Sequence, residues 1–215
     1  MRVILVRHYR TRSNAAGRIL GWGDSPPCVD WKADVDFITN QLCKGDVGID
    51  AIYSSDLTRA RQTAISYAES FGLADVIAVP ELREVNYGKL QTREKSSVFS
   101  RYPQHKKDPD LVYPDGESFH QMQRRSAPFV TSLATAYPGS TILVVSHAGV
   151  IRGLVSNFLK LEYAPNLRQK ISFRYVGDFL FEGNDCVHYD ELGQPSGFVS
   201  DGGVRIPVTI TAVVS

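Results

Sequence analysis

The chain of 215 residues carries 24 Lys and Arg against 23 Asp and Glu, so its formal net charge at pH 7 is only +1. With no overall positive field, the composition gives no reason to expect nucleic acid or a membrane surface as a partner. No apolar run approaches the roughly 20 residues that span a bilayer. The 3 cysteines fit neither a disulfide framework nor a zinc site, so we expect a cytoplasmic protein with reduced thiols.

The first expected element is a continuous apolar strand over residues 2–7, of the type that is covered on both faces in an α/β sheet. It ends on Arg7 and His8, and further arginines follow at once. Cations gathered at a strand end repel one another unless an anion lies among them. A second short strand is expected over residues 49–54.

A helix is expected next, over residues 56–71. Ser55 or Asp56 offers its N-cap, because these short side chains accept hydrogen bonds from the first backbone N–H groups of a helix. Gly72 is expected to end the helix. Another apolar run predicts a third strand over residues 76–80.

A polar stretch with several prolines occupies residues 88–116. It is long for a connection in a compact domain, and long excursions tend to be lids or binding segments. A helix over residues 117–137, a buried strand over 141–146 and an apolar helix over 148–161 are expected to follow. Residues 172–215 are expected to form strands, at least one of them antiparallel.

The alternation of strands and helices predicts the α/β class. No linker divides the chain. We therefore expect a single domain over residues 1–215, with the excursion at about 88–116 acting as a lid or substrate-shaping segment.

Two of the five histidines, His8 and His147, directly follow expected buried strands. Ligands of open α/β sheets bind at the carboxyl ends of strands, so both positions suit chemistry. Each alone could also be an ordinary polar residue at a strand end. No pair of histidines has metal-ligand spacing, so no metal is expected. The remaining histidines are interpreted as solvated or structural residues: His105, His120 and His188.

Two further charged residues stand out, and each has two interpretations. Arg59 falls in the first turn of the expected helix, where the helix macrodipole disfavours a cation. It is either a surface residue or a residue that faces a bound anion together with the helix N-terminus. Glu84 follows a strand and precedes Gly88, and its neighbour Arg83 could simply be its ion-pair partner.

Six sequence blocks follow one another along the chain: Arg7-His8 with Thr11 and Asn14; Gly17-Arg18 with Gly21 and Asp24-Ser25-Pro26; Ser55-x-Leu57-x-Arg59-Ala60-x-Gln62-Thr63-Ala64; Leu82-Arg83-Glu84 with Gly88; Asp115-Gly116-Glu117-Ser118; and Ser146-His147-Ala148-Gly149. Together they resemble the histidine phosphatase superfamily, the phosphoglycerate mutase-like group, in its phosphatase branch. The resemblance covers the chain from Met1 to about Leu159. It implies a three-layer α/β/α sandwich with a mostly parallel central sheet and at least one antiparallel strand.

The resemblance also implies a phosphomonoesterase of the metal-independent histidine acid phosphatase type, acting on a small phosphorylated metabolite. His8 would be the nucleophile and would form a phosphohistidine intermediate. Glu84 would give a proton to the leaving oxygen and later take one from the attacking water. No cofactor is implied, because fixed cations take the place of a metal.

Phosphate binding is implied for a set of cations and donors around the nucleophile. The set contains Arg7, Asn14, Arg59, His147 and the backbone N–H of Ala148 at a helix start. Its two arginines and His147 also count as catalytic, because they would neutralise charge on the phosphoryl oxygens in the transition state.

The chain departs from the family pattern beside the nucleophile. Glycine and an acidic residue usually follow the nucleophilic histidine, whereas this chain has Tyr9 and Arg10. Tyr9 either turns its side chain outward or narrows the pocket, and Arg10 either favours a more anionic substrate or points into solvent. Substrate walls are expected from residues 15–30 and 88–120. The candidates for shaping the substrate pocket are Tyr9, Arg10, Gly21 and Tyr87.

Two other functions stay open. One is a phosphoglycerate mutase, although the family's mutases have a longer and more basic excursion after Glu84. The other is a catalytically weakened phosphate-binding module, which would not need Glu84. The substrate is open among phosphorylated sugars, phosphoglycerate-like acids and nucleotide or cofactor-precursor monophosphates. The oligomeric state is also open, and strands between Val204 and Val214 could pair two chains into a homodimer.

Overall fold

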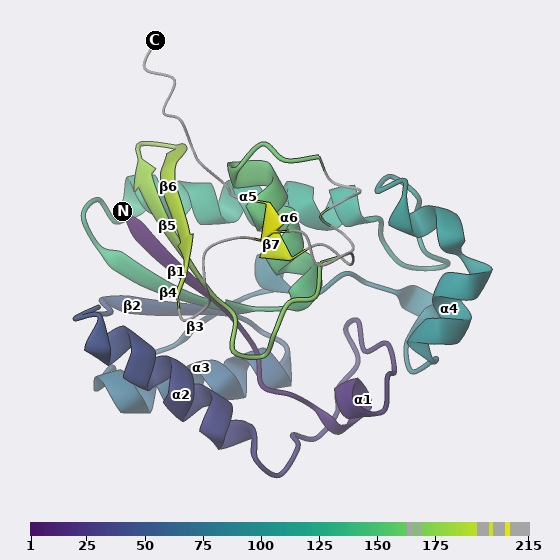
Figure 1. The fold of residues 1–215 in the computed structure, drawn as a ribbon, viewed down its shortest axis with the longest axis horizontal. Helices are drawn as coiled ribbons and strands as arrows, with labels where there is room; N and C mark the ends of the chain where they lie inside the picture. The colour runs from purple at the N-terminus through teal and green to yellow at the C-terminus, as the bar shows by residue number, and fades with distance from the viewer. Residues whose placement is uncertain (163–165, 167–168, 193–197, 200–204, 207–215) are drawn as a thin grey trace.

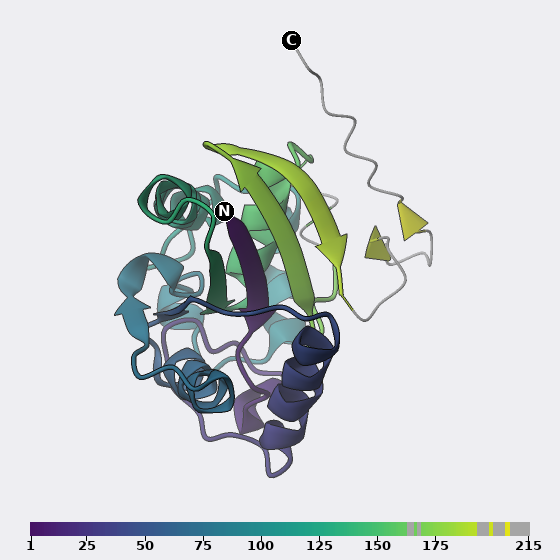
Figure 2. The same ribbon diagram turned by 90° about the vertical axis from the view of Figure 1, so that its left-hand side faces the viewer.

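A six-stranded sheet forms the centre of the computed structural model, which describes residues 1–162, 166, 169–192, 198–199 and 205–206 (Figure 1). The strands of this sheet are β1 (Arg2–Arg7), β2 (Ala51–Ser55), β3 (Ile77–Val79), β4 (Thr141–Ser146), β5 (Val176–Glu182) and β6 (Asp185–Glu191). Two short strands form a separate pair, β7 (Phe198–Val199) and β8 (Arg205–Ile206) (Figure 2).

The strand order in the sheet is β3-β2-β4-β1-β5-β6. The four strands from β3 to β1 run parallel to one another. β5 pairs antiparallel with β1, and β6 pairs antiparallel with β5. The prediction of a mostly parallel sheet with at least one antiparallel strand is confirmed.

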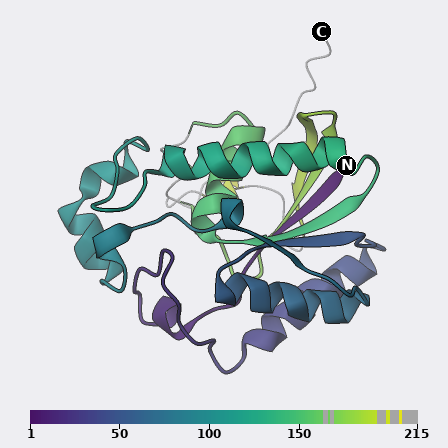
Figure 3. The ribbon, with the colours of Figure 1, turned by 180° about the vertical axis from the view of Figure 1, so that it is seen from behind.

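The longer helices are α2 (Trp31–Lys44), α3 (Thr58–Phe71), α5 (Phe119–Ala136) and α6 (Ala148–Phe158). α2 and α3 cover one face of the sheet, and α5 and α6 cover the other (Figure 1 and Figure 3). This is the predicted three-layer α/β/α sandwich. Short helical elements lie in the connections: α1 (Arg12–Ala15), η1 (Pro80–Leu82), η2 (Gly88–Leu90), α4 (Lys95–Arg101) and η3 (Pro103–Lys106).

Alternate residues of β1 belong to two separate hydrophobic cores. Val3 and Leu5 pack in the core that α5 and α6 complete, and Ile4 and Val6 pack in the core that α2 and α3 complete. All four side chains are at most 1% exposed. A strand buried on both faces has no solvent-facing side, so the polar residues of β1 are confined to its two ends.

α3 ends as predicted and begins differently. Gly72 adopts a left-handed conformation with φ of 68° and ends the helix. The N-cap residue is Leu57, so the prediction that Ser55 or Asp56 occupies this position is wrong. The carboxylate of Asp56 is instead bound by Arg83, whose Nε and Nη2 lie 2.7 and 2.5 Å from its two oxygens.

The sequence did not predict α1 or α2. In α2 the buried side chains are Val35, Ile38 and Leu42, which lie on one face of a helix. No capping side chain marks the start of α2, because Asp30 at the N-cap makes no hydrogen bond to the helix through its side chain. Asp30 and Gly45 are nevertheless residue types that mark the start and the end of a helix, so the sequence carried signals besides the apolar spacing.

The C-terminal predictions have different outcomes. β5 and β6 are the expected antiparallel strands. The strands predicted between Val204 and Val214 lie outside the described residues, apart from β8. No helix in the described part of the chain is long and apolar enough to cross a membrane.

Candidate active site

The parallel pairing of β1 with β4 brings the two strand-end histidines together. Arg7 is in register with Ser146, and the backbone N–H of His8 donates to the carbonyl of Ser146 at 2.9 Å. One residue further along, the ring centroids of His8 and His147 are 4.9 Å apart. Both side chains are buried.

His8 is held in one neutral tautomer. Its Nδ1 lies 2.6 Å from the carbonyl oxygen of Tyr9. A carbonyl oxygen only accepts hydrogen bonds, so Nδ1 carries the proton and Nε2 carries the lone pair. Nε2 accepts a hydrogen bond from Nε of Arg59 at 3.3 Å. Nε2 is thus the nitrogen that could attack a phosphorus atom.

Burial keeps both histidines uncharged. It is the main cause that lowers the pKa of His8 and of His147 well below 6.5, and Arg59 and Arg7 lower both values further by repelling another positive charge. Both imidazoles are therefore neutral at pH 7. The two ring nitrogens of His147 have no hydrogen-bond partner among the described residues. Buried polar atoms without a partner are rare, and a ligand can supply the missing bond.

Arg59, in the first turn of α3, is only 1% exposed, so its interpretation as a surface residue is wrong. Its Nη1 donates to the carbonyl of Gly23 at 2.8 Å and its Nη2 to the carbonyl of Gly21 at 2.7 Å. Together with the bond to His8, these contacts fix the loop at Gly21 and Gly23 against the candidate nucleophile. Burial lowers the pKa of Arg59 to about 10, which leaves the guanidinium charged at neutral pH.

Arg7 is held by the segment that precedes β5. Its Nη1 donates to the carbonyl of Ile171 at 2.5 Å, and the ring centroid of Phe173 lies 3.8 Å from its guanidinium carbon. Burial and the neighbouring cation Arg152 lower the pKa of Arg7 to about 9, so this side chain also stays charged at neutral pH. No local pattern marked Ile171 or Phe173 as site residues, because they lie in a stretch without regular structure.

The Glu84 carboxylate faces the start of α6. Its Oε2 accepts from the backbone N–H of Gly149 at 3.2 Å, and its Oε1 accepts from the backbone N–H of Val85 at 2.9 Å. Arg83 forms its ion pair with Asp56 rather than with Glu84. The alternative interpretation of Glu84 as the partner of Arg83 is therefore wrong.

Asn14 and Ala148 line the same cavity as His8. Asn14 forms a capping box with Thr11, in which Oδ1 of Asn14 accepts from the backbone N–H of Thr11 at 3.3 Å. Its side-chain oxygen is thus used locally, and its NH₂ group is the donor that a ligand could use. Ala148 is the first residue of α6, where backbone N–H groups favour an anion.

This cavity has a volume of about 1100 Å³. His147 is buried beside His8 and is not among the lining residues, whereas the other predicted catalytic and phosphate-binding residues line it: Arg7, His8, Asn14, Arg59, Glu84 and Ala148. Cations outnumber acids on its walls, with Arg7, Arg10, Arg18, Arg59, Lys95, Lys106, Arg152 and Lys170 against Glu84 and Glu191. This excess favours an anionic ligand. The described residues contain no group of three or more His, Cys, Asp or Glu side chains that could hold a metal ion.

The sequence matches the family model of the histidine phosphatase superfamily (branch 1) over residues 3–172. The chain belongs to this superfamily. It is 33% identical over 173 residues to the metal-independent phosphoserine phosphatase of Arabidopsis thaliana, across 77% of this chain and 71% of that protein. It is 34% identical over 166 residues to the "Probable phosphoglycerate mutase GpmB" of Serratia proteamaculans, across 75% of this chain and 76% of the relative. Among solved structures it is similar to Bacillus stearothermophilus YhfR, with a TM-score of 0.79, 25% identity and coverage of 91% and 98% of the two chains.

The departures from the histidine phosphatase pattern beside His8 have different consequences. The ring of Tyr9 packs 4.7 Å from that of Trp31, and its hydroxyl donates to Gln62 at 2.7 Å. These contacts bury Tyr9, and it is not among the residues that line the cavity. Arg10 is exposed and lines the cavity. The other two candidates for substrate shaping also line it: Gly21 and Tyr87.

Two of the wall segments of this superfamily member are hydrogen-bonded to each other. The backbone N–H of Thr92 donates to the carbonyl of Ile19 at 2.7 Å. The side-chain oxygen of Gln91 accepts from the backbone N–H of Trp22 at 2.6 Å. These segments are called the paired wall below: residues 17–23 and 91–95.

Aromatic rings form another part of the cavity wall. Tyr113 is 1% exposed, and its ring centroid lies 4.5 Å from that of His105 and 4.7 Å from that of Tyr87. His105 therefore belongs to the wall of the cavity, where it is partly buried rather than fully solvated. The Tyr113 hydroxyl has no hydrogen-bond partner among the described residues.

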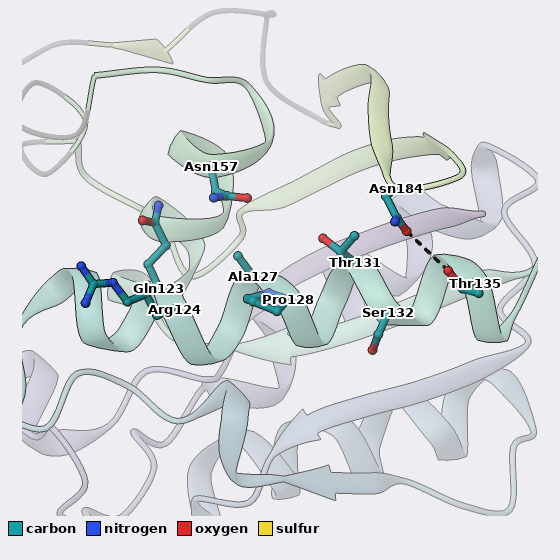
Figure 4. A pocket seen from close by; sticks show the side chains of 9 residues that line it. All are labelled: Gln123, Arg124, Ala127, Pro128, Thr131, Ser132, Thr135, Asn157 and Asn184. Carbon is teal, nitrogen blue, oxygen red and sulfur yellow. Dashed lines mark hydrogen bonds between the residues drawn. The ribbon is translucent and has the colours of Figure 1, made fainter.

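A second hollow, of about 550 Å³, lies over α5 (Figure 4). Asn157 of α6 and Asn184 of the turn between β5 and β6 complete its lining, and Asn184 is hydrogen-bonded to Thr135 at 3.4 Å. Among its lining residues only Arg124 is charged. This hollow brings together no nucleophile and acid, in contrast to the cavity at His8.

Proposed function

We propose that this protein is a phosphomonoesterase that acts through a phosphohistidine on Nε2 of His8. The observation that carries the proposal is the position of this nitrogen, whose lone pair lies beside the Arg59 guanidinium and close to His147. A neutral imidazole can attack phosphorus, and the neighbouring cations can bind the oxygens of the phosphoryl group that it attacks. The names of the two relatives, a phosphatase and a mutase, support phosphoryl chemistry.

In the first step, a bond forms between Nε2 of His8 and phosphorus while the bond from phosphorus to the ester oxygen breaks. Arg7, Arg59 and His147 donate hydrogen bonds to the other phosphoryl oxygens and balance their charge. Glu84, acting as the general acid, gives a proton to the leaving oxygen, which departs as an alcohol.

In the second step, water attacks the phosphorus atom and the bond to His8 breaks. Glu84 takes a proton from this water, so the acid of the first step is restored. Inorganic phosphate leaves, and His8 returns to its neutral state. Asn14 and the backbone N–H of Ala148 hold the phosphoryl group between the two steps.

Hydrolysis is favoured over a mutase reaction by the size of the cavity. A mutase must keep water away from its phosphorylated intermediate, whereas a cavity of about 1100 Å³ holds a small ester and water together. We further infer a substrate with a second anionic group. The support for this is that Arg10, Lys95 and Arg152 add to the cations around the nucleophile.

His8→Ala tests the proposal directly. Release of phosphate from a panel of monophosphates, including O-phosphoserine, 3-phosphoglycerate and sugar phosphates, should fall by about 1000-fold or more. The wild type should become labelled by a substrate carrying radioactive phosphorus, and the variant should not. His188→Ala removes an exposed histidine and is the matched control. Retained hydrolysis by His8→Ala would remove His8 from the mechanism.

The same panel separates the two other functions. Conversion of 3-phosphoglycerate to 2-phosphoglycerate without release of phosphate would establish a mutase. Binding of phosphate with no turnover of any ester would establish a binding module.

A further inference from the structure

We propose that Arg125, on α5, is a positioning residue that fixes the general acid Glu84 through its backbone. This inference rests on the proposed function, because it concerns the proton that Glu84 gives to the leaving oxygen. Glu84 lies between η1 and η2, in residues 83–87, which form neither helix nor strand. A catalytic group on irregular backbone keeps its position only if other parts of the protein hold that backbone.

Arg125 holds the backbone both at Glu84 and before it. Its Nη2 donates to the carbonyl of Glu84 at 2.9 Å, and its Nη1 donates to the carbonyl of Glu81 at 2.7 Å. The helix that carries Arg125 begins with a capping box between Ser118 and Gln121, which fixes its first turn. One side chain therefore ties the irregular segment to a long, well-capped helix.

Glu117 orients the Arg125 guanidinium. Nη2 of Arg125 lies 2.7 Å from Oε1 of Glu117, and Nε lies 3.2 Å from Oε2. Such a two-point contact fixes the plane of the guanidinium as well as its position. Oε1 of Glu117 also accepts from the backbone N–H of Asn86 at 2.8 Å. The Arg125–Glu117 pair thus holds the chain on both sides of Glu84.

Trp22 is a second donor to the Glu84 carbonyl, through Nε1 at 2.7 Å. It belongs to the paired wall and is 36% exposed, whereas the Arg125 side chain is 21% exposed. Arg125 is also the donor that is anchored on a helix. It is therefore the stronger support of the two.

The contacts of the carboxylate explain why this support matters for the acid. Both oxygens of Glu84 accept hydrogen bonds from backbone N–H groups, those of Val85 and Gly149. A shift of the backbone at residue 84 would therefore carry the carboxyl group away from the leaving oxygen. Loss of the Arg125 anchor should slow protonation of the leaving group and spare the attack by His8.

The test uses two esters that differ in their need for an acid. β-Glycerophosphate releases an alkoxide that must be protonated, whereas p-nitrophenyl phosphate releases a stabilised phenolate that need not be. Arg125→Lys keeps the positive charge, but an ammonium group cannot reproduce the planar set of donors. We expect the single-turnover rate of alcohol release from β-glycerophosphate to fall by about 10-fold to 100-fold, and that of phenolate release from p-nitrophenyl phosphate to change by less than about 3-fold. The first turnover is measured because Glu84 also acts in the later hydrolysis of the intermediate, which both esters share.

Arg124→Lys is the matched control, because it makes the same change one residue earlier. The Arg124 side chain is 76% exposed and lines the hollow over α5 (Figure 4), whereas Glu84 lines the cavity at His8. The Arg124→Lys variant should hydrolyse both esters at the wild-type rate. If Arg125→Lys does not fold, Glu117→Gln keeps Arg125 and weakens its two-point contact, and it should show the same selective loss.

Glu84→Gln, measured on the same esters, separates this inference from the proposed function. If Glu84→Gln slows the first turnover of both esters equally, or if the wild type hydrolyses neither, the proposed mechanism itself fails. If Glu84→Gln is selective for β-glycerophosphate but Arg125→Lys is equally slow on both esters, Arg125 has only a structural role. Wild-type rates in Arg125→Lys would also overturn the positioning role.

Discussion

Gly149 and Glu84 lie so close together that a Cβ atom on Gly149 would collide with Oε1 of the carboxylate. The backbone N–H of Gly149 also donates to Oε2 of Glu84 at 3.2 Å. Glycine inside a helix is less favourable than alanine by about 1 kcal/mol. Position 149 of α6 therefore carries glycine because the Glu84 carboxylate needs the space, although alanine would favour the helix.

Gly149→Ala should displace the Glu84 carboxylate and lower kcat on β-glycerophosphate by on the order of 100-fold, because small errors in the position of a reacting group are costly. Steady-state kinetics and a thermal unfolding curve of the same preparation would measure the effect. The control is Gly48→Ala, since Gly48 is exposed and its added Cβ would have nothing within 4 Å. A wild-type kcat in Gly149→Ala would show that Glu84 does not need this space.

Arg59→Lys should lower the free energy of unfolding as well as activity. The guanidinium donates to two carbonyls and to His8, and a lysine cannot make all three bonds. Hydrogen bonds from charged donors contribute about 1.5–3 kcal/mol each, so we expect a loss of at least about 2 kcal/mol in urea unfolding. Arg61→Lys changes an exposed residue of the same helix and serves as the control. Equal stability of the two variants would mean that the buried bonds of Arg59 add nothing to folding.

The stability of the protein should fall as the pH drops below 6.5. Above this value His8 and His147 are neutral in both the folded and the unfolded chain. Below it, the unfolded chain binds protons that the folded chain cannot, because the pKa of each buried histidine lies well below 6.5. The free energy of unfolding should then decrease by at most about 1.4 kcal/mol per pH unit for each of the two.

Urea unfolding between about pH 7.5 and about pH 5.5 would measure this slope. His147→Gln should make the slope shallower, whereas His188→Gln, which replaces an exposed histidine, should leave it unchanged. The same slope in the wild type and in His147→Gln would contradict the neutral state of His147.

Tyr9→Phe should lower the stability of the protein, and Tyr113→Phe should not. The buried hydroxyl of Tyr113 has no partner among the described residues, so its removal should leave the free energy of unfolding unchanged or raise it by about 1 kcal/mol. The hydroxyl of Tyr9 donates to Gln62, and its removal should cost about 1 kcal/mol. Thermal or urea unfolding of both variants would measure the difference. A clear loss of stability in Tyr113→Phe would show that its hydroxyl is bonded after all.

The four parallel strands, β1 to β4, were predictable because each one is recognisable within its own few residues. The apolar run in β1 and the similar run in β4 need no knowledge of the rest of the chain. The start of α3 was not predictable, because Asp56 is bound by Arg83 from a distant part of the sequence. α2 was missed although its apolar spacing is helical and residues typical of helix ends, Asp30 and Gly45, flank it.

The positions of the two histidines were predictable, but most of their surroundings were not. His8 and His147 each follow a buried strand, which local sequence reveals. That these two strands are neighbours is a property of the sheet order. Phe173 over Arg7 and Arg125 behind Glu84 depend on tertiary contacts alone, and no local pattern marks either residue.

The paired wall affects how substrate preference could evolve. Backbone atoms form much of its hydrogen bonding, as between Thr92 and Ile19, and every amino acid except proline offers the same groups. A side chain that faces the cavity, such as that of Lys95, can therefore be exchanged without undoing these backbone bonds, whereas Arg18 also donates to the carbonyl of Thr92 at 2.9 Å. An insertion in one segment would shift its partners in the other. We therefore expect substrate specificity to change through point substitutions in the paired wall. We expect insertions or deletions in one of its segments to require matching changes in the other.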